Sequence, residues 1–375
     1  MRRAFFFRTI CCVVALAIAA ELSAHEILPE LFRLNDGTSV RTSDQWKQRR
    51  VELKQIIQKH QYGHVPGRPS RLVVLSRRDF LHPTLKLRGE RIRLGIGPNS
   101  NITMDIMVYP STLSGKRPAI VREEHRIGVS LQPKIFVEAG FVYVEYERED
   151  LDPDTPNSIG SAQAAYPQFD WATIAVWAWG AMRTVDYLET RQDIDLAKVA
   201  VSGHSRGGKA ALLAGALDER FSLVNANGSG AGGAGSYIIE NPKCETLELI
   251  TRSDRFGYWF HPNLRQFKDD LSSLPFDQHF LKALIAPRAL ICTEATSDLW
   301  ANPKGTKATS RAAQEAFDFL GASEKNGLHF RSGGHNNDAR DWQAFLQFAR
   351  WHFEGQLPTD KSLFQAWKTE KQGTP

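Results

Sequence analysis

The chain has 375 residues, of which 42% are hydrophobic and 24% are charged, and its formal net charge is +5. It has no low-complexity segment and is long enough to bury one large core or two smaller ones. The basic residues are interspersed with acidic ones and form no stripe, so we expect no nucleic-acid partner, although a mildly basic surface favours an acidic polysaccharide.

The first 24 residues have the pattern of an export signal. Three arginines among the first eight residues supply positive charge, the apolar stretch 9–20 is too short to span a bilayer, and small residues end the segment at Ala24. We therefore predict a signal peptide over residues 1–24, with cleavage after Ala19 as the alternative. The mature chain is then periplasmic or secreted, with no stable membrane span.

One helix and two strands are predicted to follow the signal. Residues 46–60 carry apolar side chains at roughly helical spacing, and the Pro-Gly pair at 66–67 ends this passage. Residues 85–96 and 102–109 alternate apolar and polar side chains, which indicates antiparallel strands.

From residue 118 onward, short apolar stretches alternate with helical ones. Strands are predicted at 118–121, 141–144, 199–202, 289–293 and 328–331, and helices at 171–188, after Gly208, at 310–320 and at 342–353. Apolar strands separated by helices predict an α/β fold with a mostly parallel sheet covered on both faces, a three-layer sandwich. We expect one catalytic domain over residues 25–375, with the first helix and strands as an N-terminal extension.

The stretch GHSRG at 203–207 matches the G-x-S-x-G pattern of a nucleophile elbow. An apolar strand leads into it and an alanine-rich helix leaves it, as the elbow requires. Glycines flank the serine because the turn is sharp and leaves no room for side chains. The pattern predicts Ser205 as a nucleophile; the alternative is an ordinary strand-to-helix corner.

Nucleotide and metal sites are not supported by the sequence. Gly203 and Gly208-Lys209 have the spacing of a phosphate loop, but Ala210 replaces the hydroxyl that would hold magnesium. The glycines of NGSGAGGAG lack a clean dinucleotide pattern. No cysteines and histidines have zinc-ligand spacing, so we expect no metal and no cofactor. Cys244 and Cys292 form either one disulfide or two free thiols.

A serine nucleophile requires a histidine base and an acid that orients it. His335 lies in a glycine-containing loop after the last predicted strand, and Asp298 lies a few residues beyond the strand at 289–293. The chain order of serine, acid and histidine is that of α/β hydrolases. Glu294 is the rival acid, although its place at the strand end directs it less freely toward the histidine.

Several longer stretches carry a resemblance to a known family. These are QYGHVPG, DWATIAVWAWGAMRTVDYLETRQDID, GHSRGGKAALLAGALDERF, NGSGAGG, LPFDQHFLKALIAPR, SDLWANP and GGH, in collinear order over nearly all of the mature chain. Together they resemble the glucuronoyl esterases, which are carbohydrate esterases with the α/β-hydrolase fold. The resemblance implies hydrolysis of the ester between 4-O-methyl-glucuronic acid on xylan and lignin alcohols.

The resemblance also implies roles for individual residues. Ser205 matches the nucleophile, His335 the base, and Arg206 the residue whose guanidinium and backbone amide stabilise the oxyanion. Such a fixed cation faces charge that develops only in the tetrahedral state. Lys209 matches the lysine that hydrogen-bonds the sugar hydroxyls, and one helical turn places it on the same face as Ser205; the alternative is a solvated helix lysine.

One position departs from the fungal members of the family. They carry a glutamate directly before the S-G-x-G-G stretch, where this chain has Gly228, which cannot orient a histidine. Some bacterial members resemble this chain in placing the acid later, which favours Asp298. Trp300 resembles the tryptophan that lines the sugar site and can stack on a pyranose. Glu245 lies near the family's glucuronate-contacting acid; its alternative is a surface salt bridge.

Two further functions remain as alternatives. A broader carboxylesterase, such as an acetyl-xylan esterase, would use the same three residues because they do not select the acyl group. A sugar-binding protein on a decayed hydrolase fold is favoured only by the glycine at position 228. We expect a monomer that acts on glucuronoxylan or lignin–carbohydrate esters.

Overall fold

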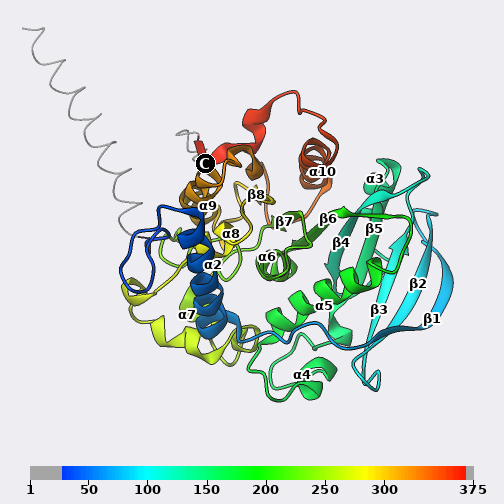
Figure 1. Ribbon diagram of the computed structural model, residues 1–375, viewed down its shortest axis with the longest axis horizontal. Helices are drawn as coiled ribbons and strands as arrows, with labels where there is room; N and C mark the ends of the chain where they lie inside the picture. Colours follow the sequence, from blue (N-terminus) through cyan, green and yellow to red (C-terminus); the bar gives the residue numbers. More distant parts are fainter. Residues whose placement is uncertain (1–27, 369–375) are drawn as a thin grey trace, which may run out of the picture.

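The computed structural model describes residues 28–368 (Figure 1). The predicted signal peptide at 1–24 therefore lies outside the described residues. Within 28–368, no helix is both long enough and apolar enough to cross a membrane.

A single nine-stranded sheet forms the centre of this part of the chain, in the order β1-β2-β3-β5-β4-β6-β7-β8-β9. Its strands are β1 (Leu72–Leu81), β2 (Arg88–Ile96), β3 (Ile102–Tyr109), β4 (Arg117–Glu124), β5 (Val142–Glu147), β6 (Ile194–His204), β7 (Leu223–Asn227), β8 (Ala289–Ala295) and β9 (Asn326–Arg331). The pairs from β1 to β5 along this order are antiparallel, and all pairs from β5 to β9 are parallel. The predicted mostly parallel sheet with an antiparallel extension is therefore confirmed.

Helices cover both faces of the sheet (Figure 1). They are α2 (Ser43–Ile57), α3 (Pro133–Glu138), α4 (Ser161–Ala165), α5 (Thr173–Leu188), α6 (Arg206–Leu217), α7 (Leu247–Ile250), α8 (Gln278–Ala283), α9 (Pro303–Phe319) and α10 (Ala339–Glu354), with a π-helical turn at Gln58–Tyr62 and short 3-10 segments elsewhere. Residues of α5 and α6 belong to one hydrophobic cluster, and residues of α3 and α10 belong to a second.

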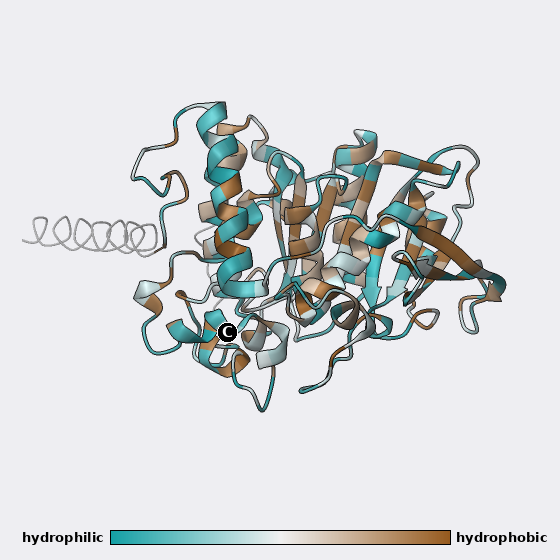
Figure 2. Ribbon diagram, turned by 60° about the horizontal axis from the view of Figure 1, so that its bottom comes forward, coloured by the Kyte–Doolittle hydropathy of each residue, from teal (hydrophilic) through white to brown (hydrophobic). Residues whose placement is uncertain are grey.

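Alternation along the strands divides the core between these two clusters. In β4, Ala119 and Val121 join the cluster under α5 and α6, whereas Ile120 joins the cluster under α3 and α10. This is the period-two pattern of a strand that is buried on both faces. Figure 2 shows the hydrophobic residues concentrated on the central strands, while α2 at the periphery carries both hydrophilic and hydrophobic residues.

The structure corrects several predicted boundaries. The helix expected at 310–320 begins at Pro303, because Asn302 caps it by accepting a hydrogen bond from the backbone N–H of Gly305 at 2.9 Å. Strands β1 and β7 were not predicted. The sequence of β7, LVNAN, contains two asparagines, and all five of its residues are buried. Of the two open possibilities for the mature cysteines, the structure has free, buried thiols at Cys244 and Cys292.

Candidate active site

The turn between β6 and α6 places Ser205 in a conformation that few residues adopt. Its backbone has φ 55° and ψ −122°, and it directly precedes the first residue of α6. A Cβ at Gly203 would lie 2.0 Å from the carbonyl oxygen of Gly207, and a Cβ at Gly207 would lie 1.7 Å from a carboxylate oxygen of Glu123. Only glycine fits at 203, where the neighbour is backbone, and a side chain at 207 would have to displace the buried carboxylate of Glu123. This is the geometry of a nucleophile elbow.

Ser205, His335 and Asp298 form one hydrogen-bonded chain. The Nε2 atom of His335 lies 3.0 Å from the Oγ of Ser205, and its Nδ1 atom lies 2.6 Å from the Oδ2 of Asp298. The three residues follow β6, β9 and β8, and carboxyl ends of parallel strands meet at one edge of a sheet. The structure thus brings together the three side chains that the sequence order selected.

The loops that carry Asp298 and His335 are joined to each other. The backbone N–H of Ser297 donates to the carbonyl of Gly333 at 3.0 Å. The buried guanidinium of Arg331 donates to the carbonyl of Asn336 and to the carboxylate of Asp341, the latter at 2.7 Å. These bonds hold the backbone on both sides of the histidine, which limits the positions that its ring can take.

Glu294, the rival acid, lies away from the histidine. Its side chain is fully buried and accepts a hydrogen bond from the hydroxyl of Thr306 on α9 at 3.1 Å. Gly228, by contrast, borders the site, because a Cβ there would lie 3.5 Å from Asp298 Oδ2 and 3.7 Å from His335 Cε1. The geometry therefore favours Asp298 over Glu294 as the partner of His335.

Glu294 and Glu145 predict how stability depends on pH. Burial, the largest cause, raises the pKa of each from 4.5 to about 8. Between the unfolded pKa of 4.5 and the folded pKa of about 8, these two carboxyls keep their protons in the folded chain but lose them in the unfolded chain. The free energy of unfolding therefore falls as pH rises through this interval. We expect Glu294→Gln, measured by urea unfolding at about pH 5 and about pH 8, to lose less stability over this interval than the parent chain. If the free energy of unfolding fell equally in both proteins, the raised pKa of Glu294 would be contradicted.

Arg206 is held beside the elbow by Asp154, a residue that the sequence analysis did not identify. The carboxylate of Asp154 accepts hydrogen bonds from Arg206 Nη1 at 2.5 Å, from Tyr258 Oη at 2.8 Å and from Trp259 Nε1 at 2.9 Å. The guanidinium of Arg206 also lies 4.8 Å from the centre of the Trp259 ring. Arg148 approaches the same carboxylate at 3.2 Å. The guanidinium of Arg206 is thus fixed before any substrate binds.

Substitution of Asp154 tests this arrangement. Asp154→Asn keeps an acceptor for Tyr258 and Trp259 but removes the charge that attracts Arg206. If Arg206 stabilises the oxyanion, as the resemblance implies, its displacement should cost much of that effect, and we expect kcat to fall roughly tenfold to hundredfold with a smaller change in KM. The control is Asp254→Asn, whose carboxylate is exposed and pairs with Arg252. A folded Asp154→Asn protein with parental kcat would disprove the role.

Lys209 is not a solvated helix lysine, because its side chain is 2% exposed. Its ammonium group donates to the carbonyls of Ser229 at 2.7 Å and Ala231 at 2.5 Å, and to the carboxylate of Glu245 at 2.7 Å. An ammonium group has three donors, so all of them are used. The alternative considered for Glu245, a surface salt bridge, is also wrong, because its pair with Lys209 is buried.

Trp300 lies next to this pair and is partly exposed. Its carbonyl accepts a hydrogen bond from the backbone N–H of Glu245 at 2.9 Å, and the guanidinium of Arg255 lies 5.9 Å from the centre of its ring. The predicted substrate-binding residues Lys209, Glu245 and Trp300 are therefore neighbours in space, although they come from α6, the segment before α7 and the loop after β8.

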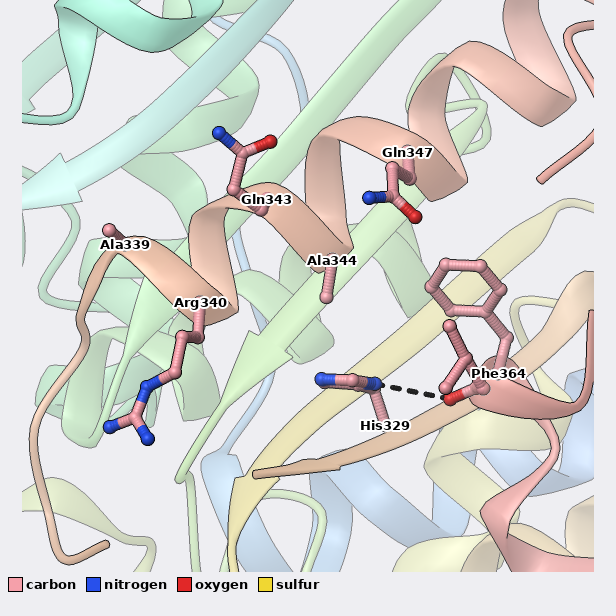
Figure 3. Close-up of a pocket in the computed structure, with 8 residues that line it drawn as sticks. His329, Ala339, Arg340, Gln343, Ala344, Gln347 and Phe364 are labelled. Atoms are coloured by element: carbon pink, nitrogen blue, oxygen red, sulfur yellow. Dashed lines mark hydrogen bonds between the residues drawn. The ribbon is translucent and has the colours of Figure 1, made fainter. Parts of the chain in front are cut away.

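The pocket shown in Figure 3 is separate from this cluster. It has a volume of about 310 Å³ and lies between α10 and the 3-10 segment Lys361–Phe364. Its lining residues are His329, Ala339, Arg340, Gln343, Ala344, Gln347, Leu363 and Phe364. None of them belongs to the Ser205, Asp298 and His335 chain. Among the described residues, no group of three or more histidines, cysteines or acids is arranged to hold a metal ion.

A serine at a strand-to-helix elbow, followed in the chain by an acid and a histidine that reach it, defines an α/β hydrolase. Comparison with known proteins narrows this class. A family model described as "Glucuronyl esterase, fungi" matches residues 97–321, which is more than half of the chain. The chain belongs to the glucuronoyl esterase family and is a carboxylic ester hydrolase.

Individual relatives agree with this assignment. The chain is 30% identical over 392 residues to Carbohydrate esterase MZ0003 from an unknown prokaryotic organism, covering 88% of this chain and 90% of that protein. It is 30% identical over 348 residues to the 4-O-methyl-glucuronoyl methylesterase of Hypocrea jecorina, with 89% and 72% covered. A family 15 glucuronoyl esterase structure from Caldicellulosiruptor kristjansonii superposes with a TM-score of 0.77 at 30% identity, covering 89% and 92%. The predicted family and α/β-hydrolase fold are therefore confirmed.

Proposed function

We propose that this chain hydrolyses esters of 4-O-methyl-D-glucuronic acid, such as those that join glucuronoxylan to lignin alcohols. The single observation that carries the proposal is the hydrogen-bonded chain from Ser205 through His335 to Asp298, at 3.0 and 2.6 Å, within a member of the glucuronoyl esterase family. The 4-O-methyl-glucuronoyl group is inferred as the acyl group because relatives of this chain are named 4-O-methyl-glucuronoyl methylesterases.

In the proposed mechanism, Ser205 Oγ attacks the ester carbonyl while His335 Nε2 accepts its proton. Asp298 holds the imidazole with its Nδ1 proton toward the carboxylate and stabilises the imidazolium that forms. His335 then protonates the departing alcohol, which leaves an acyl group on Ser205. Water, activated by the same histidine, releases the uronic acid and restores the serine.

Arg206 is the proposed site of oxyanion stabilisation. It is the first residue of α6, and the first N–H groups of a helix have no partner within that helix. Its amide and its guanidinium, which Asp154 holds, supply two donors and a positive charge where the carbonyl oxygen becomes an anion.

Sugar recognition is assigned to the cluster of Trp300, Lys209 and Glu245. The partly exposed indole of Trp300 offers a flat surface for a pyranose ring. Because the three donors of Lys209 are already used, a sugar hydroxyl reaches it only by replacing one of its carbonyl acceptors. We therefore propose Trp300 and Glu245 as the first contacts, with Lys209 holding Glu245 in place.

Hydrolysis of competing esters tests this function. The purified mature chain should release the alcohol from benzyl glucuronate faster than it releases acetate from acetyl-xylan. Dominant acetate release would replace the proposed substrate with that of a broader carboxylesterase. Binding of glucuronate without turnover of either ester would favour a decayed sugar-binding homologue.

Export to the periplasm or beyond is proposed from the sequence of residues 1–24, and the polymeric substrate agrees with it, because such polymers lie outside the cell. N-terminal sequencing of the mature protein tests it directly. A chain that begins at or near residue 25 supports export, whereas an intact chain that begins at Met1 contradicts it.

A further inference from the structure

A second histidine, His204, packs against the proposed base. It is the last residue of β6 and directly precedes Ser205. The centres of the His204 and His335 rings lie 4.9 Å apart, and the ring planes are tilted by 41°. His335 is thus restrained on three sides, by hydrogen bonds to Ser205 and Asp298 at its two nitrogens and by His204 against its ring.

The orientation and tautomer of His204 are determined by its neighbours. The side-chain amide of Asn227 donates to the carbonyl of Thr293 at 3.0 Å and to its hydroxyl at 2.9 Å. The amide oxygen of Asn227 therefore faces His204 Nδ1, at 2.6 Å. Since that oxygen only accepts, the Nδ1 atom of a neutral His204 carries the proton. Asn227 is 2% exposed and Thr293 is fully buried, so this support is rigid.

His204 is also kept uncharged. Burial is the largest cause that lowers its pKa, to about 4; electrostatic interaction with His335 and with the positive charge of Arg122 acts in the same direction, while Asn227 and Asp298 oppose it. A neutral ring is the useful neighbour here, because His335 becomes a cation during the reaction. A second cation in contact with it would repel the imidazolium, whereas an uncharged ring does not.

We propose that His204 is a positioning residue: its neutral ring, held by Asn227, keeps the imidazole of His335 aligned between Ser205 and Asp298. The inference rests on the proposed role of His335 as the base. It does not depend on which ester is the substrate, and it assigns His204 no proton transfer of its own.

Two variants separate ring contact from hydrogen bonding. His204→Phe keeps an aromatic ring beside His335 but cannot donate to Asn227. His204→Gln loses the ring but retains a donor. Because small misplacements of a reacting group cost up to about 10²-fold in rate, we expect His204→Gln to lower kcat roughly tenfold to hundredfold with KM nearly unchanged. His204→Phe should stay within about threefold of the parent.

The rate at which a fluorophosphonate modifies Ser205 provides a second readout. This reaction requires an activated serine but no sugar, so it distinguishes failure of the present inference from failure of the proposed substrate. We expect His204→Gln to slow it by the same factor as kcat. If His204→Gln reacts and turns over like the parent, or if a folded His204→Phe is as inactive as His335→Ala, the proposal is wrong.

The pH profile tests whether His204 titrates during the reaction, and a second histidine variant tests for a merely structural effect. Because His204 titrates near pH 4, the kcat/KM profile of His204→Phe between about pH 5.5 and about pH 8 should have the parental shape. His352→Gln is the matched control, since His352 is also largely buried, with a pKa near 4, but lies on α10 against Trp351. This control should change thermal stability without changing the phosphonylation rate. An equal loss of that rate in His352→Gln would reduce the His204 effect to general destabilisation and overturn the proposal.

Discussion

Replacing Ser205 with alanine is expected to lower kcat on benzyl glucuronate by on the order of 10⁶-fold, the scale seen when a serine nucleophile is removed from another hydrolase. The elbow places the Ser205 hydroxyl 3.0 Å from His335 Nε2. In the proposed mechanism no acyl-enzyme can form without it, and the remaining groups can only bind and polarise the ester. The measurement is steady-state hydrolysis at enzyme concentrations high enough to detect residual turnover.

Two controls accompany this variant. Binding of glucuronate to Ser205→Ala, measured by calorimetry, should remain close to that of the parent chain, because Trp300 and Glu245 are unchanged. The fluorophosphonate should add covalently to the parent chain and not to the variant, as mass spectrometry would show. Turnover near the parental rate in Ser205→Ala would remove Ser205 from the mechanism, whatever the substrate.

The arrangement of Ser205, Asp298 and His335 was predictable because each residue follows a strand that has a clear apolar pattern. Parallel strands bring their carboxyl ends to one edge, so order along the chain becomes proximity in space. The same reasoning selected Asp298 over Glu294, since a residue inside a buried strand is committed to the core. Periodicity, glycine spacing and the chain order of α/β hydrolases supplied these candidates, and the family resemblance further favoured Asp298.

The residues that support this arrangement carried no such signal. Asp154 lies 52 positions before Arg206, in a loop whose position depends on how the whole sheet closes. Asn227 belongs to β7, whose mixed sequence hides a buried strand that is stabilised by hydrogen bonds to Thr293. Lys209 was placed on the correct helix, but periodicity gives the face of a helix and not the depth at which a side chain is buried.

Asp298→Asn is the substitution with the next largest expected effect. In the proposed mechanism the carboxylate accepts a hydrogen bond from His335 Nδ1, 2.6 Å away, which leaves Nε2 free to accept the proton of Ser205. An asparagine amide in the same place can instead donate to Nδ1, which moves the imidazole proton to Nε2. The analogous change in a serine protease lowers kcat by about 10⁴-fold with the geometry intact, and we expect a loss of this order here.

Glu294→Gln provides the matched control. Burial raises the pKa of Glu294 to about 8, so near neutral pH its carboxyl is mostly protonated and glutamine replaces it with little change in charge or shape. We expect parental kcat for Glu294→Gln and a severe loss for Asp298→Asn, each measured on benzyl glucuronate and by the fluorophosphonate reaction. The reverse outcome would transfer the acid to Glu294. Because Glu294 lies against Thr306 on α9, that result would also require His335 to adopt a different position from the one it has here.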